Sequence, residues 1–392
     1  MNSKDKKFQI KISNQNGAVI VLVAVLTFVL LGIAAFAIDF GYRHVVRNEL
    51  QNAADSSALA AARELGKIYE NMNPASQATY VCDPGDIVPI AKQAAANNYA
   101  GDKKQLIVND ADVLIGQWPQ WQKLAVGSRT NNFNQPDAVM VTVRRQQGAN
   151  GPISTFFAPI FGVETLGISA TATAALTGQG TVAEGGLPIP VGIGKAWFNP
   201  ANWASEGKGF CDQDIKMYPT GGLAGCAGWH VYDEPVNQAN ANYLAGIINQ
   251  LNPWCDPNSQ YFDDKICKKN QGQYDPSDPY QSPESSAGDS FIFTGGTVAS
   301  ALPNMEFLYD AKKDANGIWL VDVVVYDIDS CGSQPSGSVK IAGFASAEIY
   351  GIETAQNGSK TINARVKCEL VQPGRGGGED FGTKGSIPGL VE

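Results

Sequence analysis

An uninterrupted apolar segment near the start of the chain constrains this sequence more than any other feature. Residues 17–38 contain no Asp, Glu, Lys or Arg. At about 1.5 Å per residue, a helix of this length crosses the roughly 30 Å hydrocarbon core of a bilayer. The sequence therefore predicts a transmembrane helix over residues 17–38, with the lipid bilayer as its surroundings.

The charges that precede this segment predict its orientation. Residues 1–16 form a basic tail in which lysines outnumber the one acid, Asp5. Under the positive-inside rule, a short lysine-rich tail stays in the cytoplasm. We therefore expect a single-pass protein with a cytoplasmic N-terminus and an exported C-terminal part.

A cleaved secretory signal is the alternative interpretation of the same segment. Ala35-Phe36-Ala37 has the small-x-small form of a cleavage site behind a basic and an apolar stretch. The apolar run is longer than a usual signal, however, and no turn-forming residue separates this site from the next helix. The sequence favours a retained anchor and leaves cleavage open.

The residues after the anchor predict a helix with one narrow face of small side chains. Residues 42–69 contain no proline. Small residues recur there at three- and four-residue spacing, which places them on one helical face. This small-residue stripe consists of Ala53, Ala54, Ser57, Ala58, Ala61 and Ala62. Such a stripe allows another backbone to approach closely, either in the protein's own domain or in another subunit.

The residues in and around these two segments resemble a known family. Gly17 precedes the apolar run, Asp39-Phe40-Gly41 ends it, and LQNAADSSALA follows at residues 50–60. This order is similar to the amino-terminal segment of TadE-like and TadG-like proteins, which belong to the Flp (tight adherence) pilus assembly machinery of bacteria. The resemblance implies a component of the bacterial inner membrane with a periplasmic or extracellular C-terminus. It also implies contacts with other pilus or secretion-system subunits through the helix 42–69.

Two features of related proteins are altered in this chain. A type IV prepilin carries a glutamate at the fifth position after its processing glycine, where this chain has Leu22. Some longer TadG-like proteins resemble von Willebrand factor A domains, whose metal site begins with D-x-S-x-S. The nearest counterpart begins at Asp329 and has Cys331 in place of the first serine. We expect a strand that ends in a polar turn tied by Cys331, rather than a metal site.

The sequence after the anchor predicts a first exported domain over residues 39–177. A second helix is expected at 86–100, and apolar and polar residues then alternate as in strands. The expected strands are 105–118, 138–144 and 166–176. A long helix followed by a small antiparallel sheet is a pilin-like arrangement. The apolar segment 153–161 is too short to span a bilayer, and we expect it in the core, with a membrane-proximal surface as the alternative.

Glycine-rich residues 178–186 predict a linker to a second domain, residues 187–373. This domain is loop-rich and mainly β, with a barrel and a sandwich both open. Its strand signals are 291–294, 319–326, 339–350 and 360–371. In the Gly-rich tail, residues 374–392, the glycine cluster 374–378 is expected to be flexible, and residues 387–392 are expected to add an edge strand, dock on a partner or fray. The predicted fold class of the whole chain is α+β.

All seven cysteines follow the anchor, where an oxidising compartment favours disulfides. Spacing suggests the pairs Cys211–Cys226, Cys255–Cys267 and Cys331–Cys368, with Cys82 left alone, although sequence leaves the connectivity open. A zinc site is the competing explanation. The chain contains no C-x-x-C pair and only two histidines, so zinc-type spacing is absent.

Catalysis has few candidate residues. Because His44 lies beside the predicted membrane boundary, His230 is the remaining candidate for a general base. The acids that could form a glycosidase-type pair are Asp233, Glu234, Asp263 and Asp264. We expect no catalytic residue, cofactor, metal ligand or small-molecule substrate. The net charge of −9 also argues against nucleic acid as a partner.

The predicted function is that of a non-catalytic, membrane-anchored assembly factor, anchor or minor subunit of a Flp-type pilus or related secretion system. An exported adhesin is the first rival hypothesis, with a ligand bound by Trp197, Trp203, Trp229 and Trp254. A membrane-tethered hydrolase that uses His230 is the second.

Overall fold

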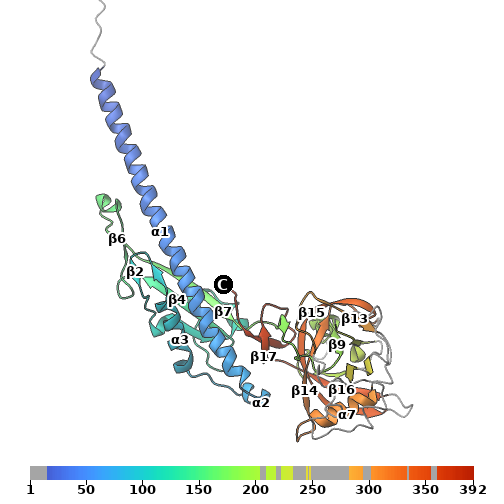
Figure 1. The fold of residues 1–392 in the computed structure, drawn as a ribbon. Helices are drawn as coiled ribbons and strands as arrows, with labels where there is room; N and C mark the ends of the chain where they lie inside the picture. The colour runs from blue at the N-terminus through green and yellow to red at the C-terminus, as the bar shows by residue number, and fades with distance from the viewer. Residues whose placement is uncertain are drawn as a thin grey trace, which may run out of the picture.

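The fold is mixed α+β and begins with one very long helix. The computed structural model describes residues 16–203, 209–217, 222–232, 244–245, 247–248, 282–294, 302–332, 335–354 and 360–392. Helix α1 (Asn16–Glu70) contains 55 residues, which corresponds to roughly 80 Å. Figure 1 shows its first part projecting away from the molecule and its second part lying along a sheet. The predicted anchor and the predicted helix 42–69 are thus one continuous element.

The first folded unit, which we call the helix–sheet body, comprises the second part of α1, residues 71–176 and the last residues of the chain. Its antiparallel sheet has the order β19 (Gly389–Leu390), β7 (Ile168–Ala175), β4 (Ala138–Arg145) and β3 (Val113–Gly116). Helix α1 packs on β7 and β4, and α3 (Pro84–Ala96) packs on α1. This arrangement confirms the predicted helix and antiparallel sheet.

Shorter elements complete the helix–sheet body. They are α2 (Pro74–Gln77), β1 (Tyr99–Ala100), β2 (Lys103–Lys104), α4 (Trp118–Trp121), β5 (Ile153–Ser154) and β6 (Thr165–Leu166). The start of α3 follows from its sequence, because the Asp83 side chain accepts a hydrogen bond from the N–H of Gly85 and Pro84 occupies the first turn. Helix α3 is therefore capped locally before it packs on α1.

The second unit, the barrel body, comprises the described residues from 187 to 368. A ring of pairings runs through β14 (Trp319–Tyr326), β9 (Val191–Gly194), β11 (Ala227–His230), β13 (Ser290–Thr294) and β15 (Gly337–Thr354). The ring closes because β14 pairs with both β9 and β15. Strands β16 (Lys360–Lys367) and β10 (Asp214–Lys216) extend the sheet from β15. Helix α7 (Leu302–Lys312) packs near β15. Of the two alternatives that the sequence left open for this domain, the structure therefore has the barrel and not the sandwich.

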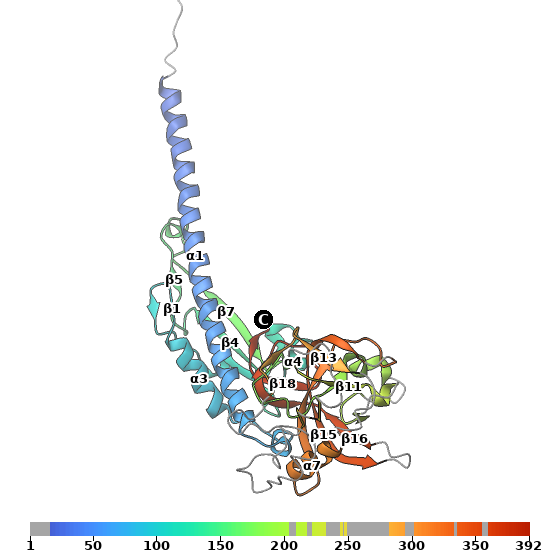
Figure 2. The same ribbon diagram turned by 45° about the vertical axis from the view of Figure 1, so that its right-hand side comes forward.

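The segments between the two bodies are packed rather than flexible. Residues 178–186, predicted as a linker, contain β8 (Thr181–Val182), which pairs with β12 (Ser285–Ser286). The predicted tail, residues 374–392, returns to the helix–sheet body. There β17 (Leu370–Arg375) pairs with β18 (Thr383–Ile387), and β19 adds an edge strand to β7. Figure 2 shows β18 and the C-terminus lying close to β7 and β4.

The glycines in these segments allow close contact between backbones. The N–H of Gly378 donates to the carbonyl of Gly178 across 2.8 Å. A Cβ atom on Gly178 would lie 2.2 Å from the carbonyl oxygen of Glu379. The sequence suggested flexibility because glycine is common in linkers, but here its missing side chain permits dense packing. The edge strand is therefore the correct alternative for the C-terminal tail.

Candidate functional site

The candidate site is the boundary between the exposed and the packed parts of α1. Side chains from Val19 to Ile38 are almost all exposed, and Leu22, Phe28 and Phe36 are among the largest of them. The exposed segment is long and apolar enough to cross a membrane, and it is the one such helix among the described residues. Aqueous exposure of so many large apolar side chains is unfavourable, whereas lipid accommodates them.

The small-residue stripe lies on the opposite side of this boundary and is buried within the protein itself. All of its members, Ala53, Ala54, Ser57, Ala58, Ala61 and Ala62, have no exposed surface. They belong to one core cluster with residues of β4, β7 and α3. Gln51 also donates a hydrogen bond of 3.2 Å to the carbonyl of Thr171 in β7. Of the two alternatives for the stripe, the structure has the protein's own domain, so the stripe is not a surface for another subunit.

Asp39 links α1 to a loop at this boundary. Its Oδ1 accepts a hydrogen bond of 2.7 Å from the N–H of Phe156. Its Oδ2 accepts bonds of 3.0 and 2.7 Å from the N–H groups of Phe157 and Ala158. A carboxylate beside an apolar helix is costly unless it is hydrogen-bonded, and three backbone donors satisfy it here. The sequence offered one signal for this role, an acid placed directly after the apolar run, but not its distant partner.

The loop bound by Asp39, residues 155–164, is named here the tip loop. It joins β5 to β6, and Thr155 closes its base by donating to the carbonyls of Val163 and Glu164 at 2.6 and 3.0 Å. Figure 1 shows this hairpin beside the middle of α1, far from the barrel body. The expectation that this segment enters the core holds for Ile153 but is wrong for Phe156 and Ile160, which are 63% and 75% exposed. The membrane-proximal surface is the alternative that remains.

Arginines lie just beyond this boundary. Arg43 and Arg47 are exposed on α1, and they line a shallow pocket with Gln146 and the start of β7. Among the described residues, neither arginine forms an ion pair. Together with Phe36 and Phe40, Arg43 also lines a mainly apolar cavity of about 480 Å³ against the tip loop. Along α1 toward the C-terminus, exposed apolar side chains at this boundary are thus followed by exposed arginines.

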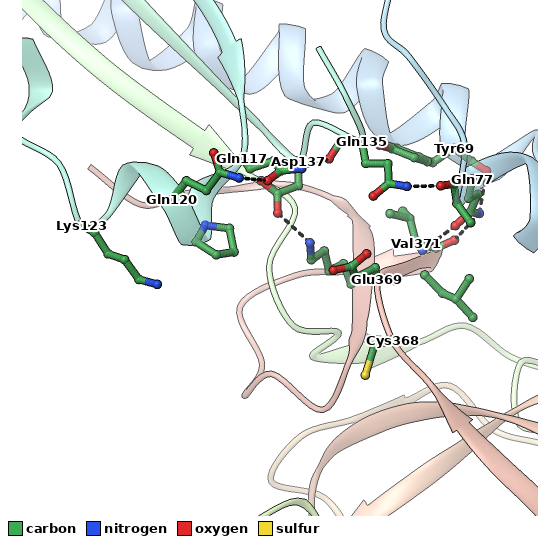
Figure 3. Close-up of a pocket in the computed structure, with 14 residues that line it drawn as sticks. Tyr69, Gln77, Gln117, Gln120, Lys123, Gln135, Asp137, Cys368, Glu369 and Val371 are labelled. Atoms are coloured by element: carbon green, nitrogen blue, oxygen red, sulfur yellow. Dashed lines mark hydrogen bonds and ion pairs between the residues drawn. The ribbon is translucent and has the colours of Figure 1, made fainter. Parts of the chain in front are cut away.

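A second pocket, of about 260 Å³, lies where the helix–sheet body meets the C-terminal segment. Figure 3 shows Gln77, Gln135 and Asp137 joined to neighbouring groups of the pocket, whereas no such contact is drawn for Lys123 and Glu369. Gln77 donates to the carbonyl of Val371 at 3.0 Å and accepts from its N–H at 2.9 Å. Lys384 lies 2.6 Å from Asp137, whose other oxygen accepts from the N–H of Trp118. These contacts hold the C-terminal segment in place.

The disulfide pairs differ from those that spacing suggested. The structure joins Cys211 with Cys368 and Cys226 with Cys331, which are separated by 157 and 105 residues. The predictions Cys211–Cys226 and Cys331–Cys368 are therefore wrong, because the ring of strands brings together cysteines that lie far apart in sequence. Cys82 is free and buried. Cys255 and Cys267 lie outside the described residues.

The described residues behind the rival hypotheses lie in the core of the barrel body. His230 has no exposed surface and lies among Tyr232, Phe291 and Phe293. Burial lowers the pKa of His230 to about 3, so the imidazole is neutral and does not reach a substrate in solvent. The tryptophans proposed for ligand binding are buried at positions 197, 203 and 229. Trp254 and the acids Asp233, Glu234, Asp263 and Asp264 lie outside the described residues.

The altered metal motif has the simpler structure expected for it. Strand β14 ends at Tyr326, and a turn leads to Cys331, which is tied to Cys226. Lys195 lies 3.6 Å from Asp327 and 2.8 Å from Glu379, so basic and acidic side chains compensate each other here. In the part of the chain that the structure describes, no three His, Cys, Asp or Glu side chains are grouped to hold a metal ion.

Comparison with protein families agrees with the geometry of this boundary. Residues 17–64 match a family described as putative Flp pilus-assembly TadE/G-like. Residues 49–174, which overlap this match, match a second family described as putative Tad-like Flp pilus-assembly. Together the two matches span residues 17–174. No protein with a curated description and no solved structure matches the chain.

The span that the two matches cover, residues 17–174, coincides with structural elements. It contains the exposed apolar part of α1, the small-residue stripe, the tip loop and the sheet strands β3 and β4, and it ends inside β7. The resemblance read from residues 17–60 is confirmed. The chain is therefore related to Flp pilus assembly, and the barrel body lies beyond both matches.

Proposed function

We propose that this chain is a non-catalytic, single-pass component of a Flp/Tad-type pilus or related secretion system. In this proposal residues 17–38 span the bacterial inner membrane, the N-terminus is cytoplasmic, and both folded bodies are periplasmic or extracellular. The observation that carries the proposal is the match of residues 17–174 to the two Tad families, over a helix whose first part is apolar and exposed.

The mechanism we propose is positional. Helix α1 runs from the anchor into the core of the helix–sheet body, so no flexible linker separates the two. A rigid connection fixes the height and the direction of the body above the membrane, which an assembly factor or minor subunit needs in order to meet its neighbours.

Contacts with other subunits through the helix 42–69 must then use the face that the stripe leaves free. Apart from Val45, the exposed residues of this helix are polar or basic, and they include Arg47, Asn48, Asn52 and Lys67. Acidic or amide-rich surfaces on neighbouring subunits are the complementary partners.

Absence of catalysis is part of the proposal. Its support is that His230, the residue on which the hydrolase hypothesis depended, is buried among aromatic rings. In the same way, three of the four tryptophans that the adhesin hypothesis requires for ligand binding are buried in the core.

The test uses a deletion strain of the host and electron microscopy of surface filaments. One complementing form is the full-length chain, and a second replaces residues 17–38 by an unrelated transmembrane helix of equal length. A third replaces residues 1–38 by a cleavable signal, which exports the bodies without an anchor. We expect filaments with the first two forms and none with the third. Normal filaments in the uncomplemented strain would contradict the assembly role, and full rescue by the third form would contradict anchoring.

A further inference from the structure

The tip loop presents more apolar surface than an aqueous position explains. Phe156, Phe157, Ile160 and Val163 are exposed together on a loop of ten residues, and Ile160 is 75% exposed. Phe36 and Phe40 extend this surface along α1. A contiguous apolar surface of this kind marks a contact with another molecule or with a membrane.

The position of the tip loop along α1 identifies that contact. Three N–H groups at the start of the loop bind Asp39, the residue that directly follows Ile38 at the end of the predicted span. The loop therefore lies at the level where α1 leaves the hydrocarbon. Aromatic side chains at this level are typical of membrane–water interfaces.

The orientation of the loop is fixed by several contacts. The ring of Phe156 packs edge-on against Tyr42 with the ring centroids 5.3 Å apart. Thr155 closes the base of the loop, and Gly162 adopts a φ of 80°, which allows the tight turn at its tip. The apolar side chains are thus held together on one surface beside the helix.

Basic residues follow at the height expected for lipid phosphates. Arg43 and Arg47 lie one and two turns beyond Asp39, at about 6 and 12 Å along the helix axis. Both are exposed and, within the described part of the chain, free of ion pairs. An apolar level next to the hydrocarbon with a basic level above it matches the layers of an anionic membrane surface.

From these observations we infer that the tip loop is a second membrane contact. Its apolar side chains insert into the outer leaflet at the exit of α1, while Arg43 and Arg47 bind the phosphates of anionic lipids. Asp39 couples this contact to the anchor, so that α1 and the tip loop hold the helix–sheet body at two points. This inference rests on the membrane anchoring proposed above.

Photocrosslinking in a bilayer tests the inference. The full-length chain carries p-benzoylphenylalanine in place of Phe156 or Ile160 and is reconstituted into vesicles of equimolar phosphatidylethanolamine and phosphatidylglycerol. Phe28 in the apolar span is the positive control, and the exposed Tyr350 in the barrel body is the negative control. We expect lipid adducts, detected by mass spectrometry, at positions 28, 156 and 160 and none at 350.

The outcomes separate the inference from the anchoring on which it depends. Lipid adducts at 28 but not at 156 or 160 would overturn the tip-loop contact and leave the anchor intact. Absence of lipid adducts at 28 would count against the anchor itself. Repetition in host membranes adds one outcome: a crosslink from 156 or 160 to a protein instead of a lipid would assign the surface to a subunit and overturn the inference.

A second arm tests the arginines. With the crosslinker at position 156, we expect the adducts to favour phosphatidylglycerol severalfold over phosphatidylethanolamine. The double variant Arg43→Gln/Arg47→Gln should reduce this preference to nearly equal amounts without abolishing the adducts. An unchanged preference would show that the arginines do not select the lipid. Lys103→Gln, which removes a basic charge elsewhere in the helix–sheet body, serves as the matched control.

Discussion

The helix–sheet body and the barrel body solve the problem of a stable core in different ways. The helix–sheet body packs small side chains of α1 closely against β4 and β7, and its described part contains no disulfide. The barrel body instead packs large aromatic residues and carries both described disulfides. Close backbone packing suits a helix that must continue straight into an anchor, whereas covalent links suit a loop-rich ring of strands.

The C-terminal segment connects the barrel body to the helix–sheet body. After Cys368 it runs along the helix–sheet body, where β18 lies against α1 and β19 extends the sheet. The difference between the bodies therefore has a testable form. Changes in packing should act on the helix–sheet body, loss of a disulfide should act on the barrel body, and loss of the ion pair between Lys384 and Asp137 should act where the C-terminal segment meets the helix–sheet body.

Loss of a disulfide should give the largest effect. The double variant Cys226→Ser/Cys331→Ser should destabilise the barrel body by about 2–5 kcal/mol, because the bond closes a long loop. Hydrogen exchange measured peptide by peptide should show faster exchange in β9, β11 and β14 and little change in α3 and β4. The control is Cys82→Ser, which removes a free thiol and leaves both described disulfides intact. Equal loss of protection in both bodies would contradict their independence.

A methyl group at the contact between α1 and β18 should come next. In Gly66→Ala the new Cβ would lie 1.9 Å from the carbonyl oxygen of Ser386, so the backbone must shift, at a cost of about 2–3 kcal/mol. Exchange should quicken in β18 and β19. The matched control is Gly41→Ala, which places its Cβ in open space on the same helix and should be neutral or slightly stabilising. The comparison fails if the two variants behave alike.

Removal of the cation at the junction should have a smaller effect. Lys384→Met leaves the nearly buried Asp137 carboxylate without its ion pair, which should cost about 1–2 kcal/mol, partly offset by the bond from Trp118. Chemical denaturation measures the loss. Lys313→Met removes an exposed pair with Asp310, which solvent screens, and should have little effect on stability. A similar loss in both variants would show that burial at the junction does not matter.

Two buried groups should make the stability of the barrel body depend on pH, and they act in opposite directions. Burial lowers the pKa of His230 to about 3, so below about pH 6.5 the unfolded chain binds a proton that the folded chain does not, and the contribution of His230 to stability falls by about 1 kcal/mol between pH 7 and 5.5. Burial raises the pKa of Asp322 to about 7, so over the same range the folded chain binds a proton that the unfolded chain does not, which offsets this loss. Thermal denaturation of His230→Phe should lack the contribution of His230, so that this variant becomes more stable than the parent chain as the pH falls. An unchanged slope would place its source at other groups.

Local patterns were enough for some elements and not for others. The anchor, the helix 42–69 and the strands β4 and β14 were predicted closely, because each depends on the periodicity of neighbouring residues. The apolar segment 153–161 was expected in the core because hydrophobicity alone does not distinguish a buried segment from an exposed one. Asp39, whose hydrogen bonds hold the exposed loop beside α1, lies more than a hundred residues earlier in the chain.

Sequence by itself determined that the chain has one long apolar helix, a TadE/G-like beginning and two further regions of different composition. Tertiary structure alone decided what the small-residue stripe packs against, which cysteines pair, how the strands close into a ring and where the C-terminal glycines lie. The physical reason is the range of the interactions. Helix formation and membrane insertion depend on adjacent side chains, whereas packing, disulfides and ring closure depend on residues that only the folded chain brings together.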